Sequence, residues 1–414
     1  MKLKITNFFA LVLALASVTL SAQNVTTASI NGRVVSQSGQ EVNDAKVVVV
    51  HQPTGSRYTA MTDNSGRYAI DGLRIGGPYT IDVTSGTGNE ELGGIYLSLG
   101  QSLRLNVTVG MKNTTLGEVE IVATKNEILN SQRTGAATNV KVEALNTLPT
   151  FSRSLNDFTR LTPQSRPSSV ASTAGSGVSF AGADSRFNNL TIDGSIFNNS
   201  FGLASGPGGQ TNSSPISLDA IEEVQVNIAP YDVRQGGFTG AGINAITRSG
   251  GNEVSASVFY NTRNQNFRGD TVTYLDKDGV KTGSGLKIND FAVNQFGFRV
   301  GGPIKKDKIF FFLNAEGERR IDPATLFTAN NNDGTTDLNE TRVLRSDLED
   351  VRNLLINKFN YNPGAFENYS NETYSDKILA KFDFNLNDKN KAWIRVNYLK
   401  SYRDVLSSNS GVVS

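Results

Sequence analysis

After Gly250 the chain repeats one pattern, in which apolar and polar residues alternate strictly over short runs. The runs are "SASVFYNTR", "NQFGFRVGG", "IFFFLNAEG", "KILAKFDFNL" and "AWIRVNYLK". Because successive side chains of a β-strand point to opposite faces, each run predicts a strand with one apolar and one polar face. In the last run, Ile394, Val396 and Tyr398 would lie on the apolar face, opposite Arg395 and Asn397.

The connections between these runs alternate in length. Those at "PIKKDK" and "NDKNK" are short, whereas Gln265–Val293 and Arg320–Ser375 are long and polar. Outer-membrane barrels have short periplasmic turns and long extracellular loops, and a soluble sandwich has no reason to sort its loops in this way. Residues 251–414 are therefore predicted to be the first part of an antiparallel transmembrane β-barrel, with about five strands. An open sheet leaves unpaired edges in a bilayer, so we expect an N-terminal piece of a longer protein.

The alternation also assigns a face to each strand residue. The apolar face is expected to contact outer-membrane lipid, and the polar face the lumen or a domain that fills it. The residues expected toward lipid are Val258, Phe298, Leu313, Phe382 and Val396, and those expected inward are Ser257, Arg299, Asn314, Lys381 and Asn397.

Residues 1–22 have the features of a secretory signal peptide. Lys2 and Lys4 precede an apolar core from Phe8 to Leu20, and the small residues Ser21 and Ala22 follow it. The core is too short to span a bilayer as a helix. The chain has no cysteine to acylate, so a lipoprotein anchor is excluded. We expect a bacterial protein exported to the periplasm or beyond.

The composition argues against most kinds of catalytic and metal-binding site. The chain has no cysteine and one histidine, His51, which excludes thiolate catalysis and sites built on pairs of histidines. Glu222 and Glu223 are consecutive, so in an extended strand their carboxylates would point apart and serve poorly as an acid–base pair. With 40 Lys and Arg against 39 Asp and Glu, nothing favours nucleic acid. We expect no enzyme, no catalytic residues, no cofactor and no metal site.

Residues 23–112 read as a small β-sandwich of about seven short strands separated by turns. Gly32-x-Val34, Ala45-x-Val47, Thr62-Asp63-x-x-Gly66-x-Tyr68 and Tyr79-x-Ile81 occur in that order. The segment resembles the carboxypeptidase-regulatory-like domain, which implies a transthyretin-like sandwich. Asp63 to Gly66 is interpreted as a tight turn rather than a metal site, and His51 as a residue at the end of a strand.

Residues 124–250 are rich in Ser, Gly and Asn, but they carry three landmarks in order. A hairpin is predicted at Asp193-Gly194, a short helix from Ser217 leads into the strand "IEEVQV", and the glycine-rich "GGFTGAGINAITRSGG" follows. Together they resemble the plug domain of TonB-dependent outer-membrane receptors. The stretch "GGPIKKDKIFFFLNAEGE" resembles the Oar-like subgroup of that family. The expected fold is mainly β: a sandwich, a mixed α/β plug, and the first barrel strands.

The resemblance implies energised import of an extracellular ligand, with the TonB complex as partner. Residues 113–123 form a linker that contains the TonB-box-like "EVEIVA", and an extended segment of this kind suits strand addition to a partner's sheet. The proposed TonB contacts are Glu118, Val119, Glu120, Ile121, Val122 and Ala123. The same residues can also be interpreted as one more strand of the sandwich.

Cargo contacts are the functional interpretation of Asn198, Asn199 and Phe201 in the apical plug loop after the hairpin, and ordinary loop roles are the favoured alternative. The cargo class stays open between peptide, protein and oligosaccharide, as does the assistance of a surface lipoprotein. The alternative function is a secreted or surface adhesin, or a carbohydrate-binding protein, made of β modules. A transporter continues in alternating strands, whereas an adhesin continues in further sandwiches.

The second long loop carries two further features. "ANNNDGTTDLNE", residues 329–340, approaches a calcium-loop spacing, but Ala329 stands where a carboxylate is required, so a solvated turn is favoured. The following "SDLEDVRNLLINKF" predicts an amphipathic helix with Ser346 as its N-cap, packing the loop.

Overall fold

A computed structural model of the chain describes residues 25–110, 136–150, 153–167, 177–199, 206–230, 235–267, 290–325, 327–334 and 340–405, with a few shorter stretches between them. They form two compact units. The first extends to Ala256 and includes 299–314 and 379–397; the second holds the remaining parts of the C-terminal strands and their loops. Among the described residues, no helix is long and apolar enough to span a membrane.

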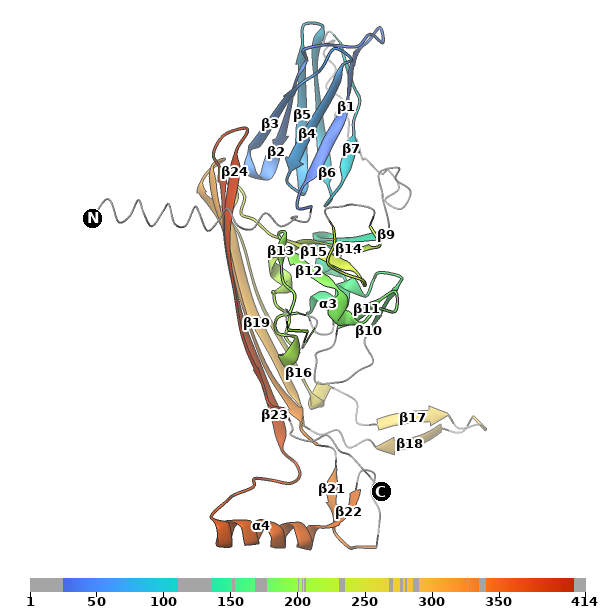
Figure 1. The fold of residues 1–414 in the computed structure, drawn as a ribbon, viewed down its shortest axis with the longest axis vertical. Helices are drawn as coiled ribbons and strands as arrows, with labels where there is room; N and C mark the ends of the chain where they lie inside the picture. The colour runs from blue at the N-terminus through green and yellow to red at the C-terminus, as the bar shows by residue number, and fades with distance from the viewer. Residues whose placement is uncertain are drawn as a thin grey trace, which may run out of the picture. The chain divides into compact units, whose positions relative to one another are not determined.

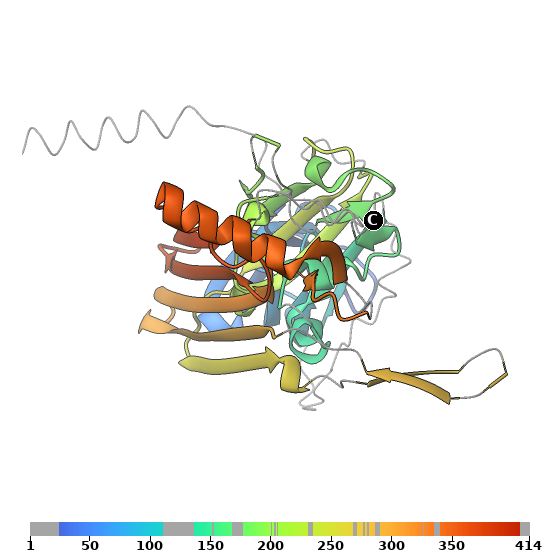
Figure 2. The same cartoon turned by 90° about the horizontal axis from the view of Figure 1, so that it is seen from below.

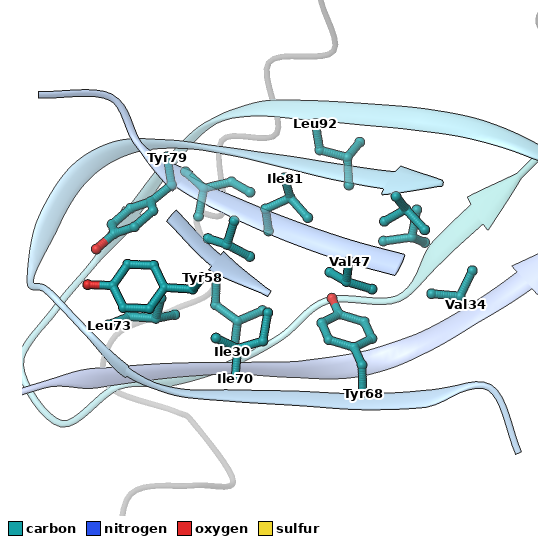
Figure 3. Close-up of a cluster of buried hydrophobic side chains, with 14 of the residues drawn as sticks. Ile30, Val34, Val47, Tyr58, Tyr68, Ile70, Leu73, Tyr79, Ile81 and Leu92 are labelled. Atoms are coloured by element: carbon teal, nitrogen blue, oxygen red, sulfur yellow. The ribbon is translucent and has the colours of Figure 1, made fainter. Parts of the chain in front are cut away.

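Residues 28–110 form two sheets, one mixed and one antiparallel, which we call the sandwich (Figure 1). One sheet contains β1 (Ala28–Ser36), β4 (Arg67–Leu73), β7 (Ser102–Arg104) and β8 (Val107–Val109), and the other contains β3 (Ser56–Met61), β2 (Lys46–His51), β5 (Gly76–Ser85) and β6 (Gly88–Leu97). Alternate residues of both sheets are buried, and Ile30, Val47 and Ile81 face a common core (Figure 3). The predicted sandwich is confirmed.

The structure confirms two local predictions for the sandwich, the tight turn at Asp63 to Gly66 and the position of His51 at the end of a strand. Asp63 Oδ1 accepts hydrogen bonds from the backbone N–H groups of Ser65 and Arg67, and Gly66 adopts φ 67°, as a tight turn requires. His51 ends β2 and is buried against Thr54, 2.7 Å from its hydroxyl. Burial, followed by the Arg74 charge, lowers the pKa of His51 to about 3, so the ring is neutral.

The plug, residues 136–250, is built on a mixed five-stranded sheet in the order β13-β12-β15-β14-β9. These strands are β9 (Ala136–Lys141), β12 (Asn189–Ile192), β13 (Ser195–Ile196), β14 (Ile221–Ile228) and β15 (Gly242–Thr247). Helices α2 (Val142–Thr147) and α3 (Leu155–Thr159) and the pair β10 (Ser165–Pro167) and β11 (Val178–Phe180) complete it. The predicted hairpin at Asp193-Gly194 joins β12 to β13, and Ser217 caps the 3-10 turn η4 (Leu218–Ala220) that leads into β14.

Five long strands form one sheet in the order β16-β19-β20-β23-β24, which we call the wall; Figure 2 shows them side by side. They are β16 (Ser255–Asn264), β19 (Ala292–Lys305), β20 (Ile309–Pro323), β23 (Ser370–Asn385) and β24 (Lys391–Arg403). The last four have 13 to 16 residues, more than the roughly 9–11 that a tilted strand needs to cross a membrane. The strands therefore continue into the regions predicted as loops.

The two long connections contain structure of their own. The first carries β17 (Thr271–Leu275) paired with β18 (Lys281–Gly285). The second carries β21 (Thr328–Asn330), β22 (Glu340–Leu344) and helix α4 (Arg345–Phe359), the long orange coiled ribbon in Figure 2.

The predicted start of this helix is wrong. The N-cap is Leu344, without a side-chain hydrogen bond, rather than Ser346. No residue of α4 is fully buried in the described chain, and Val351 and Leu354 are exposed. Leu348 and Leu355 are half-buried and the helix contacts β21 and β22, so it packs against the loop in part. Helix formation here follows from the strong helix formers of the segment rather than from a cap.

The faces of the wall strands follow the predicted alternation. The residues expected toward lipid are exposed, from Phe382 at 36% to Val258 at 82%. On the opposite face Asn314 and Lys381 are buried, and Ser257, Arg299 and Asn397 are half-buried.

Candidate functional site

Asp193 occupies the hairpin turn of the plug, where its backbone has φ 46° and that of Gly194 has φ 79°. Two central residues with positive φ are the requirement of a two-residue hairpin turn, which asparagine, aspartate and glycine meet best. The turn directs the Asp193 carboxylate onto Thr247, the last residue of β15. Thr247 donates its backbone N–H at 2.8 Å and its hydroxyl at 2.5 Å.

Two cations from the wall complete this network. Arg395 of β24 donates Nη1–H to Asp193 Oδ2 at 2.9 Å. Lys381 of β23 lies with Nζ 3.7 Å from the same oxygen and donates to the carbonyl and hydroxyl of Thr247. All three charged side chains are at most 7% exposed. Since buried charges are tolerated only when paired and hydrogen-bonded, each of these groups depends on the others.

Further contacts surround the Asp193 network. The Arg395 guanidinium lies over the rings of Phe197 and Trp393, 5.5 and 5.9 Å from their centroids. Asn397 Nδ2 donates to the carbonyl of Pro215. Phe312 and Leu379 of the wall belong to the apolar core cluster of the plug. The plug is thus fastened to the inner face of the wall by both apolar packing and charged groups.

At two positions of the glycine-rich passage, steric crowding explains why the residue is glycine. A Cβ on Gly240 would lie 2.2 Å from Asn188 Oδ1, and one on Gly250 would lie 2.3 Å from the Phe311 carbonyl oxygen. Both distances are far below any normal contact. The approach of backbone atoms at Gly250 leaves no room for a side chain there, whereas at Gly240 the obstructing atom belongs to the Asn188 side chain.

The sandwich touches the plug at the turn between β6 and β7. The backbone N–H of Leu99 donates to both carboxylate oxygens of Glu223, at 3.1 Å each, and its carbonyl accepts from Gln225 Nε2 at 3.0 Å. Asn139 Nδ2 donates to Glu223 Oε1 at 2.9 Å. We call this group of four residues the plug contact.

The predicted separation of the Glu222 and Glu223 carboxylates stays a prediction. The pairing of β14 with β15 shifts register between Ile221 and Glu223, and different neighbouring charges act on the two residues: Arg248 on Glu222 and Lys141 on Glu223. The two carboxylates remain close enough for the charge of Glu222 to raise the pKa of Glu223.

Burial is the main cause that raises the pKa of Glu223 to about 7, against the lowering effects of the Leu99 N–H, of Lys141 and of Asn139. A carboxyl whose pKa is raised in the folded chain binds a proton more readily there than in the unfolded chain, so protonation favours the folded arrangement around Glu223. The region around Glu223 and the Leu99 turn is therefore expected to be more stable at about pH 6 than at about pH 8, with the loss as pH rises through about 7.

Hydrogen exchange of the Leu99 amide in the full-length receptor measures this pH effect. Glu223→Gln should flatten the pH dependence, after correction for intrinsic exchange, because glutamine cannot ionise. Faster corrected exchange at acid pH, or an unchanged profile in Glu223→Gln, would contradict the assignment.

The sandwich also touches the wall. Arg74 Nη2 lies 2.6 Å from Asp383 Oδ1, in a pair whose carboxylate is 2% exposed. The Ser56 hydroxyl donates to Asn385 Oδ1, and Asn385 Nδ2 donates to the carbonyl of Thr54. The Asn252 N–H donates to the carbonyl of Pro53, within η1 (Gln52–Thr54). We call this set the wall contact.

The predicted TonB contacts, Glu118 to Ala123, lie outside the described residues. Among the predicted cargo residues, Asn198 accepts the Leu190 N–H and donates to Asn189, which makes it a brace of the hairpin. Asn199 accepts the Phe201 N–H, and the Phe201 ring is 86% exposed. Roles for Asn198, Asn199 and Phe201 in ligand binding stay predictions.

The loop with calcium-like spacing is only partly described. Glu340 accepts the Asn331 N–H, and Glu367 accepts the Ala329 N–H and pairs with Arg345. Within the part of the chain that the structure describes, no three His, Asp or Glu side chains are grouped to hold a metal ion.

Three family models match the chain in sequence order. A carboxypeptidase regulatory-like domain matches residues 29–110, a TonB-dependent receptor plug domain matches 130–243, and an outer membrane beta barrel domain matches 246–413. The TonB-dependent transporter Oar of Myxococcus xanthus is 29% identical over 307 residues, which cover 70% of this chain and 27% of that protein. The chain therefore spans about a quarter of the length of this relative.

Solved structures of two related proteins resemble the chain in part. The siderophore receptor PirA of Acinetobacter baumannii is 16% identical, with a TM-score of 0.41 over 65% of this chain and 32% of that one. The outer membrane transporter YddB of Escherichia coli is 17% identical, with a TM-score of 0.44 over 65% of this chain and 33% of that one. On its three domain matches and their order, the chain belongs to the TonB-dependent receptors of the bacterial outer membrane, with a carboxypeptidase-regulatory-like domain in front of the plug.

Proposed function

We propose that the chain is the N-terminal part of a transporter that imports an extracellular ligand across the outer membrane, using energy delivered by the TonB complex. The observation that carries the proposal is the Asp193 network. It links the plug to the inner face of the wall through side-chain hydrogen bonds of Arg395 and Lys381, beside the apolar contacts of Phe312 and Leu379. Side-chain contacts of this kind, rather than a shared backbone ladder, suit a domain that must move and return.

The segment Glu118 to Ala123 is the proposed TonB contact. It falls between Val109, where the sandwich ends, and Ala136, where the plug sheet begins, so force applied to it reaches both domains. Valine and isoleucine alternate with glutamate, which suits an added strand whose backbone provides the affinity. Asn198, Asn199 and Phe201 are the proposed cargo contacts, with a peptide, protein or oligosaccharide as cargo and a surface lipoprotein as a further candidate partner.

The adhesin alternative is less well supported, because neither a plug domain nor a wall with an inward charged network serves a purely adhesive role. The sequence that follows residue 414 distinguishes the two: further alternating strands support the transporter, and further sandwiches support the adhesin.

Binding of the TonB periplasmic domain to the purified full-length receptor tests the proposal. Ile121→Pro is expected to weaken binding by about tenfold or more, because proline removes a backbone donor and fixes φ. Asn126→Pro, shortly after the linker and outside the proposed contact, should bind normally, and Ile121→Val should too because it keeps the donor. Equal affinity for Ile121→Pro and Asn126→Pro would sink the assignment.

A further inference from the structure

The sandwich has two separate attachments, and they differ in how they depend on the plug. The plug contact consists of the Leu99 backbone with Glu223, Asn139 and Gln225, and the Leu99 side chain packs beside it with Ile75 and Ile246. The wall contact consists of Arg74 with Asp383 and of the η1 region with Asn385 and Asn252. No residue belongs to both sets, so one set can break while the other stays intact.

Asn139 gives the plug contact a mechanical weakness. It lies on β9, which is the edge strand of the plug sheet and pairs with β14 alone. The strand begins at Ala136, directly after residues 111–135, which join it to the sandwich. A pull on that connection acts on the Ala136–Ile228 end of the ladder and would separate the residue pairs one after another.

Separation of β9 reaches the plug contact before the strand is fully detached. Asn139 pairs with Gln225 in the ladder, and Lys141 pairs with Glu223. Loss of Asn139 removes a hydrogen bond from Glu223 Oε1 and one from Gln225. The Leu99 turn then keeps only part of its partners, while no member of the wall contact lies on β9.

We propose that the sandwich stays bound to the wall during transport, and that the plug contact around Leu99 is the attachment that opens when β9 is pulled. The sandwich then acts as a fixed support at the wall, and the plug moves away from it and returns. This inference rests on the proposed function for the source of the force, but the independence of the two attachments can be tested without TonB.

Single cysteines report each attachment, since these 414 residues contain none. Leu99→Cys, at a side chain that is 2% exposed, reports the plug contact and leaves the backbone groups of Leu99 in place. Ser56→Cys, at a side chain that is 1% exposed, reports the wall contact. The measurement is the rate of maleimide labelling in the full-length receptor in cells, with any cysteine outside residues 1–414 changed to serine.

In cells without TonB, adding Glu223→Ala should raise labelling of Leu99→Cys about tenfold or more, because the Leu99 N–H loses its carboxyl acceptor. Labelling of Ser56→Cys should stay unchanged. Glu143→Gln, at an exposed glutamate of α2, is the control and should leave labelling of Leu99→Cys within about twofold of the parent. Exposure of both cysteines by Glu223→Ala would overturn the proposal, since the sandwich would then leave the wall together with the plug.

In cells with TonB, labelling of Leu99→Cys should rise and that of Ser56→Cys should not. Cross-links between TonB and the receptor are measured in the same cells, to show that TonB engages it. Cross-links without a rise in labelling of Leu99→Cys would overturn the inference and leave the proposed function intact. A rise at both cysteines would overturn it as well.

Discussion

Replacement of Asp193 by alanine is expected to destabilise the seating of the plug by about 3–5 kcal/mol. The substitution leaves Arg395 and Lys381 buried without their anion, and it leaves the Thr247 N–H without its acceptor. A buried cation left without its anion destabilises the protein much more than the ion pair stabilises it. The free-energy cost of removing both cations from water is then no longer offset. Urea denaturation of the full-length receptor, followed by tryptic cleavage of the plug, measures the loss.

The matched control is Asp184→Ala, which removes another plug aspartate. Asp184 pairs with Arg186 at the surface, where both side chains are more than 40% exposed, so its loss should cost about 1 kcal/mol or less. Combining Asp193→Ala with Arg395→Ala should cost less than the sum of the single changes, since the two groups share one interaction. A cost for Asp193→Ala no larger than that for Asp184→Ala would refute the network as a plug fastening.

Replacement of Val396 by arginine is expected to destabilise the assembled receptor by about 2–4 kcal/mol. Replacement of Asn397 by arginine should destabilise it much less. Val396 is 63% exposed near the middle of β24, on the face assigned to lipid. Asn397, one residue further, faces inward and donates to the Pro215 carbonyl. An arginine there keeps a polar environment, whereas at Val396 it must enter hydrocarbon. Folding titrations of the two variants in lipid vesicles compare them, and equal costs would count against the barrel assignment.

The face on which each wall residue lies could be predicted, because it depends only on the alternation of successive side chains along a strand. Val396 and Asn397 separate to opposite faces whatever the strands pair with. Strand length could not be predicted, since β20 continues through Arg319 and Arg320 into residues that read as loop. Polar residues at a strand end look the same in sequence whether or not a ladder continues through them.

The Asp193 network could be predicted only in part. The Asp-Gly turn is a local signal that the sequence shows directly, but Arg395 lies 202 positions away in the chain. Nothing in a single sequence says which inward cation meets which plug anion. The roles of Glu223 and Asn139 were missed for the same reason, because both depend on the Leu99 turn of another domain. The register shift between Ile221 and Glu223 could not be predicted because neither a glycine nor a proline marks it.

Photo-cross-linking from position 121 of the full-length receptor in living cells tests energy coupling most directly. A photoreactive residue in place of Ile121 should give an adduct with TonB that disappears when the TonB gene is deleted, and the same residue at Asn126 should give little or none. Adducts confined to the receptor itself, unchanged by deletion of TonB, would contradict the proposal that this segment receives the force that moves the plug.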